Sequence, residues 1–81
     1  MLIEVYTREN CKYCFKTKHE LETRKISYTE YNLAEEDVRD ELLIKAPGAT
    51  LLPQIFINEV NIGGYDELLD YFDNHNMNIK T

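Results

Sequence analysis

Two cysteines three positions apart, Cys11 and Cys14, are the residues of this 81-residue chain best suited to do chemistry. A disulfide between them would close a loop too small to stabilise a fold. The first residues lack the pattern of a secretion signal, so we expect the pair to be redox-active or bound to a metal. Zinc needs two further ligands, and only His19 and His75 are available. His19 is expected to face away on the same helix, which favours redox chemistry.

The surroundings of Cys11 favour the thiolate, which is the form that attacks disulfides. The helix predicted to begin at this cysteine directs its free backbone N–H groups and the positive end of its dipole at the sulfur. Arg8, Lys12 and Lys16 place positive charge nearby, and the thiol of Cys14 lies one helical turn along. Cys14 is expected to be the less exposed sulfur. We therefore expect Cys11 to attack and Cys14 to resolve the mixed disulfide.

The rest of the chain alternates strand-forming and helix-forming segments. The expected elements are strand 2–6, helix 11–24, strand 26–33, helix 35–45, strands 54–58 and 60–62, and helix 66–74. This order predicts an α/β fold in which the first three elements form a right-handed unit with parallel strands. Cys11 then follows the carboxyl end of the first strand, where α/β sheets place their chemistry.

Each predicted helix has an apolar stripe that is expected to face the sheet. The three stripes are Cys14, Phe15 and Leu21 with the stems of Thr17 and Lys18, then Val38, Leu42 and Leu43, then Leu68, Leu69 and Phe72. Helices of this kind can cover both faces of a sheet. The length suits a single domain over residues 1–81.

Charge is distributed unevenly along the chain, whose net charge is -6. Residues 8–25 hold six basic and three acidic side chains, whereas residues 26–81 hold three basic and eleven acidic ones. The acidic balance argues against nucleic acid as a partner, because phosphate backbones require clustered Lys and Arg. No apolar run is long enough to suggest a membrane span, so we expect a soluble cytoplasmic protein. The basic segment around the cysteines suggests an anionic ligand there.

Three segments together resemble the glutaredoxins of the thioredoxin-fold superfamily. Residues 7–14, Thr-Arg-Glu-Asn-Cys-Lys-Tyr-Cys, look like the dithiol loop of that family. Residues 52–57, Leu-Pro-Gln-Ile-Phe-Ile, look like its cis-proline segment and following strand. Residues 62–68, Ile-Gly-Gly-Tyr-Asp-Glu-Leu, are similar to its Gly-Gly glutathione motif. The short chain also resembles the small bacterial and phage glutaredoxins.

The resemblance implies a thioredoxin fold, with a four-stranded mixed sheet in the order 2-1-3-4 and the third strand antiparallel. It also implies a thiol–disulfide oxidoreductase that reduces protein disulfides and glutathione mixed disulfides. Glutathione would be the reductant, and no metal is expected. Ribonucleotide reductase is a target suggested by the family alone, and we expect the chain to act as a monomer.

The resemblance further implies a glutathione site. Its residues would be Arg8, Tyr13, Leu52, Pro53, Gly64, Tyr65 and Asp66. Tyr13 would flank the glutathione sulfur, and the backbone of Leu52 would bind the glutathione cysteine. The backbone of Tyr65 and the carboxylate of Asp66 would hold the γ-glutamyl end. Arg8 would face the glycine carboxylate or steady the thiolate.

Several of these residues also have simpler roles. Without the family resemblance, Pro53 would be expected to be trans, because about 5–6% of X–Pro bonds are cis. The pair Gly63 and Gly64 could be only a turn, and Asp66 only a helix N-cap. Tyr13 could be a solvent-facing aromatic residue.

The sequence departs from the family pattern at three positions. Lys12 stands where proline is common, which adds a charge beside the attacking cysteine and puts the redox potential in question. Leu51 stands where threonine is usual, so one polar contact to glutathione could be missing. Lys25 replaces a frequent glycine after the helix, at a cost of about 1 kcal/mol if that residue is left-handed.

Two other functions remain open from the sequence. One is a redoxin of the same fold that is reduced directly by thioredoxin reductase, against which the Gly-Gly-Tyr-Asp run argues. The other is an iron–sulfur carrier in which Cys11 and glutathione hold a cluster between two chains. Cys14 and Tyr13 argue against the carrier, because family members of that kind often have a single active-site cysteine.

Overall fold

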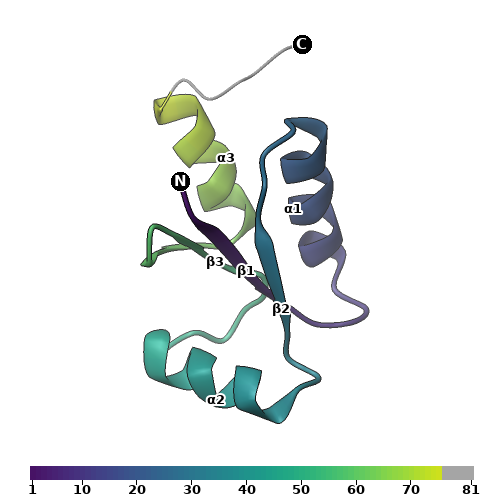
Figure 1. Cartoon of the computed structure of the whole chain (residues 1–81), viewed down its shortest axis with the longest axis vertical. Helices are drawn as coiled ribbons and strands as arrows, with labels where there is room; N and C mark the ends of the chain where they lie inside the picture. The colour runs from purple at the N-terminus through teal and green to yellow at the C-terminus, as the bar shows by residue number, and fades with distance from the viewer. Residues whose placement is uncertain (76–81) are drawn as a thin grey trace.

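The computed structural model describes residues 1–75, which form the seven elements in the predicted order. The elements are β1 (Ile3–Thr7), α1 (Lys12–Thr23), β2 (Thr29–Asn32), α2 (Glu36–Lys45), β3 (Gln54–Ile57), β4 (Val60–Gly63) and α3 (Tyr65–Asn74) (Figure 1). The second strand is shorter than predicted, because Ile26 and Tyr28 pack against the core from the connection that precedes it. The single domain predicted over residues 1–81 extends past the described part of the chain.

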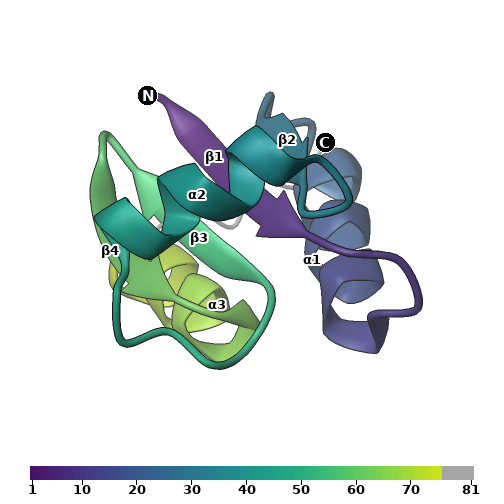
Figure 2. The same cartoon turned by 90° about the horizontal axis from the view of Figure 1, so that it is seen from below.

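The four strands form one mixed sheet in the order β2-β1-β3-β4. β1 runs parallel to β2 and antiparallel to β3, and β4 is antiparallel to β3. The predicted order 2-1-3-4, with its antiparallel third strand, is therefore confirmed. Figure 2 shows the layers: α2 crosses one face of the sheet, and α1 and α3 lie on the other. This is the thioredoxin fold.

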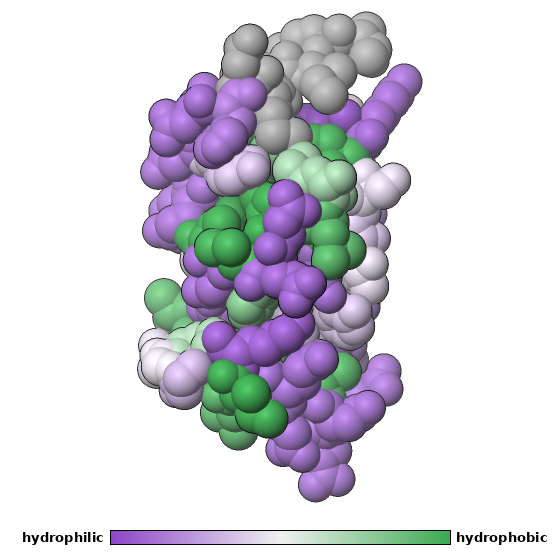
Figure 3. All heavy atoms as spheres, turned by 60° about the vertical axis from the view of Figure 1, so that its left-hand side comes forward, coloured by the Kyte–Doolittle hydropathy of each residue, from purple (hydrophilic) through white to green (hydrophobic). Residues whose placement is uncertain are grey.

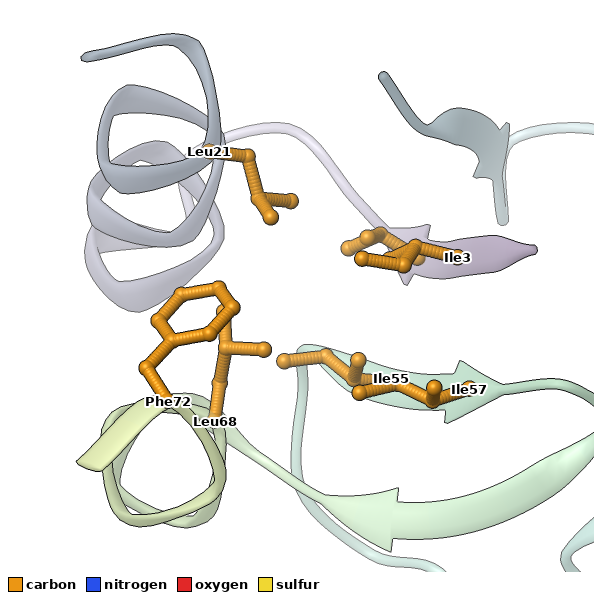
Figure 4. Close-up of a cluster of buried hydrophobic side chains, with 7 residues drawn as sticks. Ile3, Leu21, Ile55, Ile57, Leu68 and Phe72 are labelled. Carbon is orange, nitrogen blue, oxygen red and sulfur yellow. The ribbon is translucent and has the colours of Figure 1, made fainter. Parts of the chain in front are cut away.

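The main core lies between the sheet and the pair α1 and α3. Alternate residues of the two central strands point to this face, because successive side chains of a strand point to opposite sides. The buried set is Ile3, Val5, Leu21, Ile55, Ile57, Leu68 and Phe72. Figure 4 shows side chains from both strands and both helices pointing toward one another. Fully burying one such aliphatic or aromatic side chain contributes about 1.5–3 kcal/mol.

The other face of the central strands packs against α2 and contains polar groups. Tyr6 is buried between Val38 and Leu42 of α2 and the neighbouring Phe56. Its hydroxyl donates to Glu41 Oε1 at 2.8 Å. Burial raises the pKa of Tyr6, and the hydrogen bond to Glu41 raises it further. The hydroxyl therefore keeps its proton at neutral pH and fixes α2 to the sheet.

Two residues of the predicted stripes face solvent instead. Phe15 is 69% exposed, and Leu43 is 62% exposed. The buried face of α1 consists of Cys14, Thr17 and Leu21, which are three and four positions apart. Phe15 is one position out of phase with that face, and a helix turns about 100° per residue, so its ring points to solvent.

The surface mixes apolar and polar side chains. On the face drawn in Figure 3, green apolar groups are separated by purple hydrophilic ones. Within residues 1–75, no helix combines the length and the hydropathy needed to cross a membrane.

Candidate active site

Cys11 is the N-cap of α1 and holds its sulfur at the start of the helix. Its backbone is extended, with φ -114° and ψ 105°, and the backbone N–H of Cys14 donates to Cys11 Sγ at 3.2 Å. The two sulfurs are joined in a disulfide. Cys11 is half-buried, whereas Cys14 is 2% exposed, as the sequence predicts. A nucleophile at the surface and a resolving thiol beneath it are the arrangement that dithiol exchange requires.

The loop before Cys11 is anchored by two hydrogen bonds to one carboxylate, that of Glu30. Thr7, the last residue of β1, donates its hydroxyl to Glu30 Oε2 at 2.6 Å. Lys18 of α1 donates to the same oxygen at 3.0 Å. Burial alone would raise the pKa of Glu30, but the hydrogen bonds from Thr7 and Lys18 outweigh it and lower the pKa. The ionised carboxylate therefore holds β1, β2 and α1 together at the start of the loop before Cys11.

The segment before β3 faces the sulfur of Cys11. The peptide bond between Leu52 and Pro53 is cis, as the family resemblance implies, and not trans. The carbonyl oxygen of Leu52 lies 3.8 Å from Cys11 Sγ. β1 and β3 are antiparallel, so the end of the first strand and the start of the third meet at one edge of the sheet. Residues 41 positions apart are thereby brought into contact.

Gly63 and Gly64 form the sharp connection between β4 and α3. Gly63 has φ +109°, and a Cβ there would lie 2.9 Å from Cγ of Glu67. Gly64 is the N-cap of α3, and its N–H donates to Glu67 Oε1 at 2.8 Å. The alternative role of Asp66 as the N-cap is therefore wrong. Asp66 lies exposed in the first turn, and no hydrogen bond or ion pair within the described residues uses its carboxylate.

A groove of about 620 Å³ runs beside the catalytic sulfur between these segments. It is lined by Tyr13, Leu51, Leu52, Pro53, Gln54, Gly63, Gly64, Tyr65, Asp66 and Glu67. The rings of Tyr13 and Tyr65, which both line the groove, lie 5.8 Å apart between their centroids. Partial burial raises the pKa of Tyr65, and the carboxylates of Glu20 and Asp66 raise it further.

The groove contains six of the seven residues predicted to bind glutathione, and Arg8 is the exception. Arg8 lines a second hollow of about 710 Å³, together with Cys11 and Cys14. Four residues of the groove are outside the predicted set: Leu51, Gln54, Gly63 and Glu67. Glu67 could have been found, because a Glu three residues after an N-cap is the spacing of a capping box.

A metal site is not evident in this part of the molecule. Among residues 1–75, no three His, Cys, Asp or Glu side chains gather in a way that could hold an ion. The two cysteines are the sulfur ligands that such a site would use, and here they are bonded to each other.

Comparisons with known proteins agree with this geometry. A family model described as Glutaredoxin matches residues 3–62. Glutaredoxin 3 of Escherichia coli strain K12 is 39% identical over 66 residues, which are 82% of this chain and 80% of that protein.

Two solved structures extend the likeness to the three-dimensional fold. Glutaredoxin 1 from Francisella tularensis, complexed with cacodylate, superposes with a TM-score of 0.75 at 28% identity, over 91% of this chain and 94% of that chain. The glutaredoxin-like protein NrdH-redoxin from Escherichia coli superposes with a TM-score of 0.71 at 25% identity, over 100% and 99% of the two chains. With its Cys11–Cys14 redox pair at the edge of a thioredoxin-fold sheet, the chain belongs to the glutaredoxin family of thiol–disulfide oxidoreductases.

Proposed function

We propose that this enzyme takes its electrons from glutathione and that the groove beside Cys11 is the glutathione site. The single observation that carries the proposal is the composition of that groove. It joins free N–H groups at the start of α3, the free carboxylate of Asp66 and the backbone of Leu52, all next to Cys11 Sγ. Glutathione offers the matching groups: a γ-glutamyl carboxylate and ammonium at one end and a cysteine in the middle.

Each part of glutathione has a complementary group in the groove. The γ-glutamyl carboxylate suits the N–H groups of Tyr65 and its neighbours, because the first turn of a helix leaves them without intrahelical partners. The γ-glutamyl ammonium suits the carboxylate of Asp66. The cysteine would pair with the backbone of Leu52, held by the cis bond to Pro53, and its sulfur would lie beside Tyr13. Arg8, which shares the second hollow with Cys11, suits the alternative of steadying the thiolate.

The reaction follows from the two sulfurs. The thiolate of Cys11 attacks a sulfur of the substrate disulfide, a new S–S bond forms, and the other substrate sulfur leaves as a thiolate. Cys14, deprotonated, attacks Cys11 Sγ and releases the substrate, which leaves the Cys11–Cys14 disulfide. Two glutathione molecules then return two electrons and become glutathione disulfide. With a glutathione mixed disulfide as substrate, Cys11 alone suffices for the first exchange.

The glutathione site is tested by Asp66→Asn. The substitution removes the charge that would bind the γ-glutamyl ammonium, in a bond worth about 1.5–3 kcal/mol. We expect the KM for a glutathione mixed disulfide to rise by about ten- to a hundredfold. The rate at which the variant, driven by dithiothreitol, reduces a small disulfide that lacks glutathione should stay unchanged. Unchanged glutathione kinetics in the folded variant would remove Asp66 from the site.

A second candidate function is a redoxin that thioredoxin reductase reduces directly. One observation favours it: the match to NrdH-redoxin, a protein described as having a thioredoxin-like activity profile, covers almost the whole of both chains. The unpartnered Asp66 in the groove favours glutathione over this alternative. An iron–sulfur carrier would need the sulfur of Cys11 free to ligate a cluster, and visible absorbance of the purified protein would reveal one.

We propose further that the chain works as a monomer in the cytoplasm. Its substrates would be protein disulfides and glutathione mixed disulfides, with ribonucleotide reductase as a target suggested by the family.

A further inference from the structure

The second hollow beside Cys11 is basic and is separate from the groove assigned to glutathione. It is lined by Arg8, Glu9, Asn10, Cys11, Lys12, Cys14, Phe15, Lys16 and Lys18. None of the residues assigned to the γ-glutamyl or cysteinyl part of glutathione lines it. Cys11, in contrast, lines this hollow. A substrate whose sulfur is attacked by Cys11 therefore has part of its chain in or next to the hollow.

In the described part of the chain, three of the four cations of the hollow lack an acidic partner. The fourth, Lys18, pairs with Glu30 at 3.0 Å, and outside the hollow Arg24 pairs with Glu20 at 3.0 Å. Within residues 1–75, no ion pair involves Arg8, Lys12 or Lys16, although the chain carries a net charge of -6. Lys12 and Lys16 instead lie 5.8 and 5.4 Å from the ring centroid of Tyr13. Ring faces leave most of an ammonium's hydrogen-bonding capacity unused, so both remain available to an anion.

The spacing of two of these cations fits an extended peptide. Lys12 and Lys16 are four residues apart on α1, which places them on one side of the helix about 6 Å apart along its axis. In an extended chain, every second side chain points the same way at a repeat of about 6.6 Å. Two carboxylates separated by one residue would therefore meet the two ammonium groups. Phe15 lines the same hollow with a ring that is 69% exposed and offers an apolar contact between them.

We propose that this hollow is the docking site for protein substrates, and that it selects an extended acidic segment, with acidic residues at alternate positions, next to the half-cystine that Cys11 attacks. Glutathione and the protein substrate then approach Cys11 from two different hollows. The exchange at Cys11 is the one described above, and the hollow contributes only binding and orientation of the peptide.

Two peptides of equal length, each with one internal disulfide, test this proposal. One carries Asp-x-Asp beside a half-cystine, and the other carries Asn-x-Asn at the same positions. The protein is first reduced with dithiothreitol and freed of it, and the rate of a single turnover is measured without glutathione. The outcome is therefore independent of which reductant serves the enzyme.

At low ionic strength, we expect the acidic peptide to react about three- to tenfold faster, which is the size of two or three solvent-exposed charge pairs. Salt at about 0.5 M should abolish the difference, since it screens exposed charges. An acidic peptide that reacts no faster than the neutral one would overturn the proposal. Repulsion from the acidic residues in the rest of the chain would then dominate.

A matched pair of variants separates the hollow from the overall charge. Lys16→Gln and Lys25→Gln change the net charge equally, and both lysines are exposed, but Lys25 lies past the other end of α1. We expect Lys16→Gln to slow the acidic peptide about two- to threefold more than the neutral peptide, whose own change reports any effect of Lys16 on the thiolate of Cys11. Lys25→Gln should affect neither. Equal effects of both variants on the acidic peptide would show a general charge effect and would overturn the assignment of this hollow.

Discussion

Cys11 and Cys14 differ in exposure, and from this difference we infer their roles. The half-buried sulfur of Cys11 accepts a hydrogen bond from the N–H of Cys14, whereas the sulfur of Cys14 belongs to the core side of α1. We expect Cys14→Ser to keep reducing a glutathione mixed disulfide, because that exchange needs one thiol, and Cys11→Ser to lose all activity. Steady-state assays of both variants check this. Equal losses in the two variants would show that the roles are not divided in this way.

Gly63 is a position where only glycine fits without strain. Its φ of +109° is unfavourable for other residues, and an added Cβ would lie 2.9 Å from the Glu67 side chain that holds Gly64. We expect Gly63→Ala to destabilise the fold by about 1–3 kcal/mol. For a chain of this size, each 1 kcal/mol lowers the Tm by about 4–8 °C.

Gly64→Ala is the control for this prediction. A Cβ at Gly64 would lie 3.4 Å from the carbonyl oxygen of Pro53, and the residue has a negative φ of -107°. Thermal melts should therefore show a smaller decrease in Tm for Gly64→Ala than for Gly63→Ala. An equally large decrease in Tm for Gly64→Ala would mean that the backbone angle of Gly63 is not what requires glycine.

At the scale of elements, Glu30 ties β2 to the end of β1 and to α1. The pKa of this carboxyl in the folded protein is lowered from its ordinary value of about 4.5. The unfolded chain therefore binds the proton first as the pH falls. The stabilisation is present above about pH 4.5 and is lost as the pH falls through the lower folded pKa.

We expect urea unfolding to show a steeper loss of stability below about pH 4.5 for the wild type than for Glu30→Gln. The Gln variant has no carboxylate at this position. Its free energy of unfolding should therefore be lower at pH 7 and should fall less steeply as the pH decreases. Identical pH profiles would mean that other carboxyl groups cause the whole acid loss.

The elements could be predicted from the sequence because strand formers, helix stops and turn residues follow one another at short intervals. The facing of individual side chains was harder to predict. α1 has only Cys14, Phe15 and Leu21 as apolar residues on its predicted stripe, and so few positions do not fix the rotation of a helix about its axis. Thr17, whose stem was expected on the stripe, is buried, whereas Phe15 is not, because tertiary packing, and not side-chain hydropathy, sets that rotation.

The family pattern, which often has glycine after the first helix, pointed to Lys25 as a position that a left-handed backbone would strain. Lys25 has φ 60°, as its place after the helix suggests. Asn58 and Glu59, with φ 49° and 70°, form the turn between β3 and β4. Asn adopts this conformation readily, whereas Glu does not, so the residue type does not predict the conformation of Glu59.

At the scale of the whole molecule, the site forms because three chain segments end at one edge of the sheet. Cys11 follows β1, Pro53 precedes the antiparallel β3, and Gly64 follows β4. The motif residues could therefore be assigned from the sequence through the family resemblance and the predicted topology. The division between two hollows, with Arg8 away from the groove, depends on side-chain positions that no sequence pattern records.

The proposed function requires glutathione as the source of electrons, and one assay tests this most directly. NADPH oxidation is followed with a disulfide substrate and one of two reducing systems: glutathione with glutathione reductase, or thioredoxin reductase alone. We expect the protein to turn over with the glutathione system and to show only background oxidation with thioredoxin reductase. Turnover with thioredoxin reductase at a rate equal to or above that with glutathione would contradict the account and favour the redoxin.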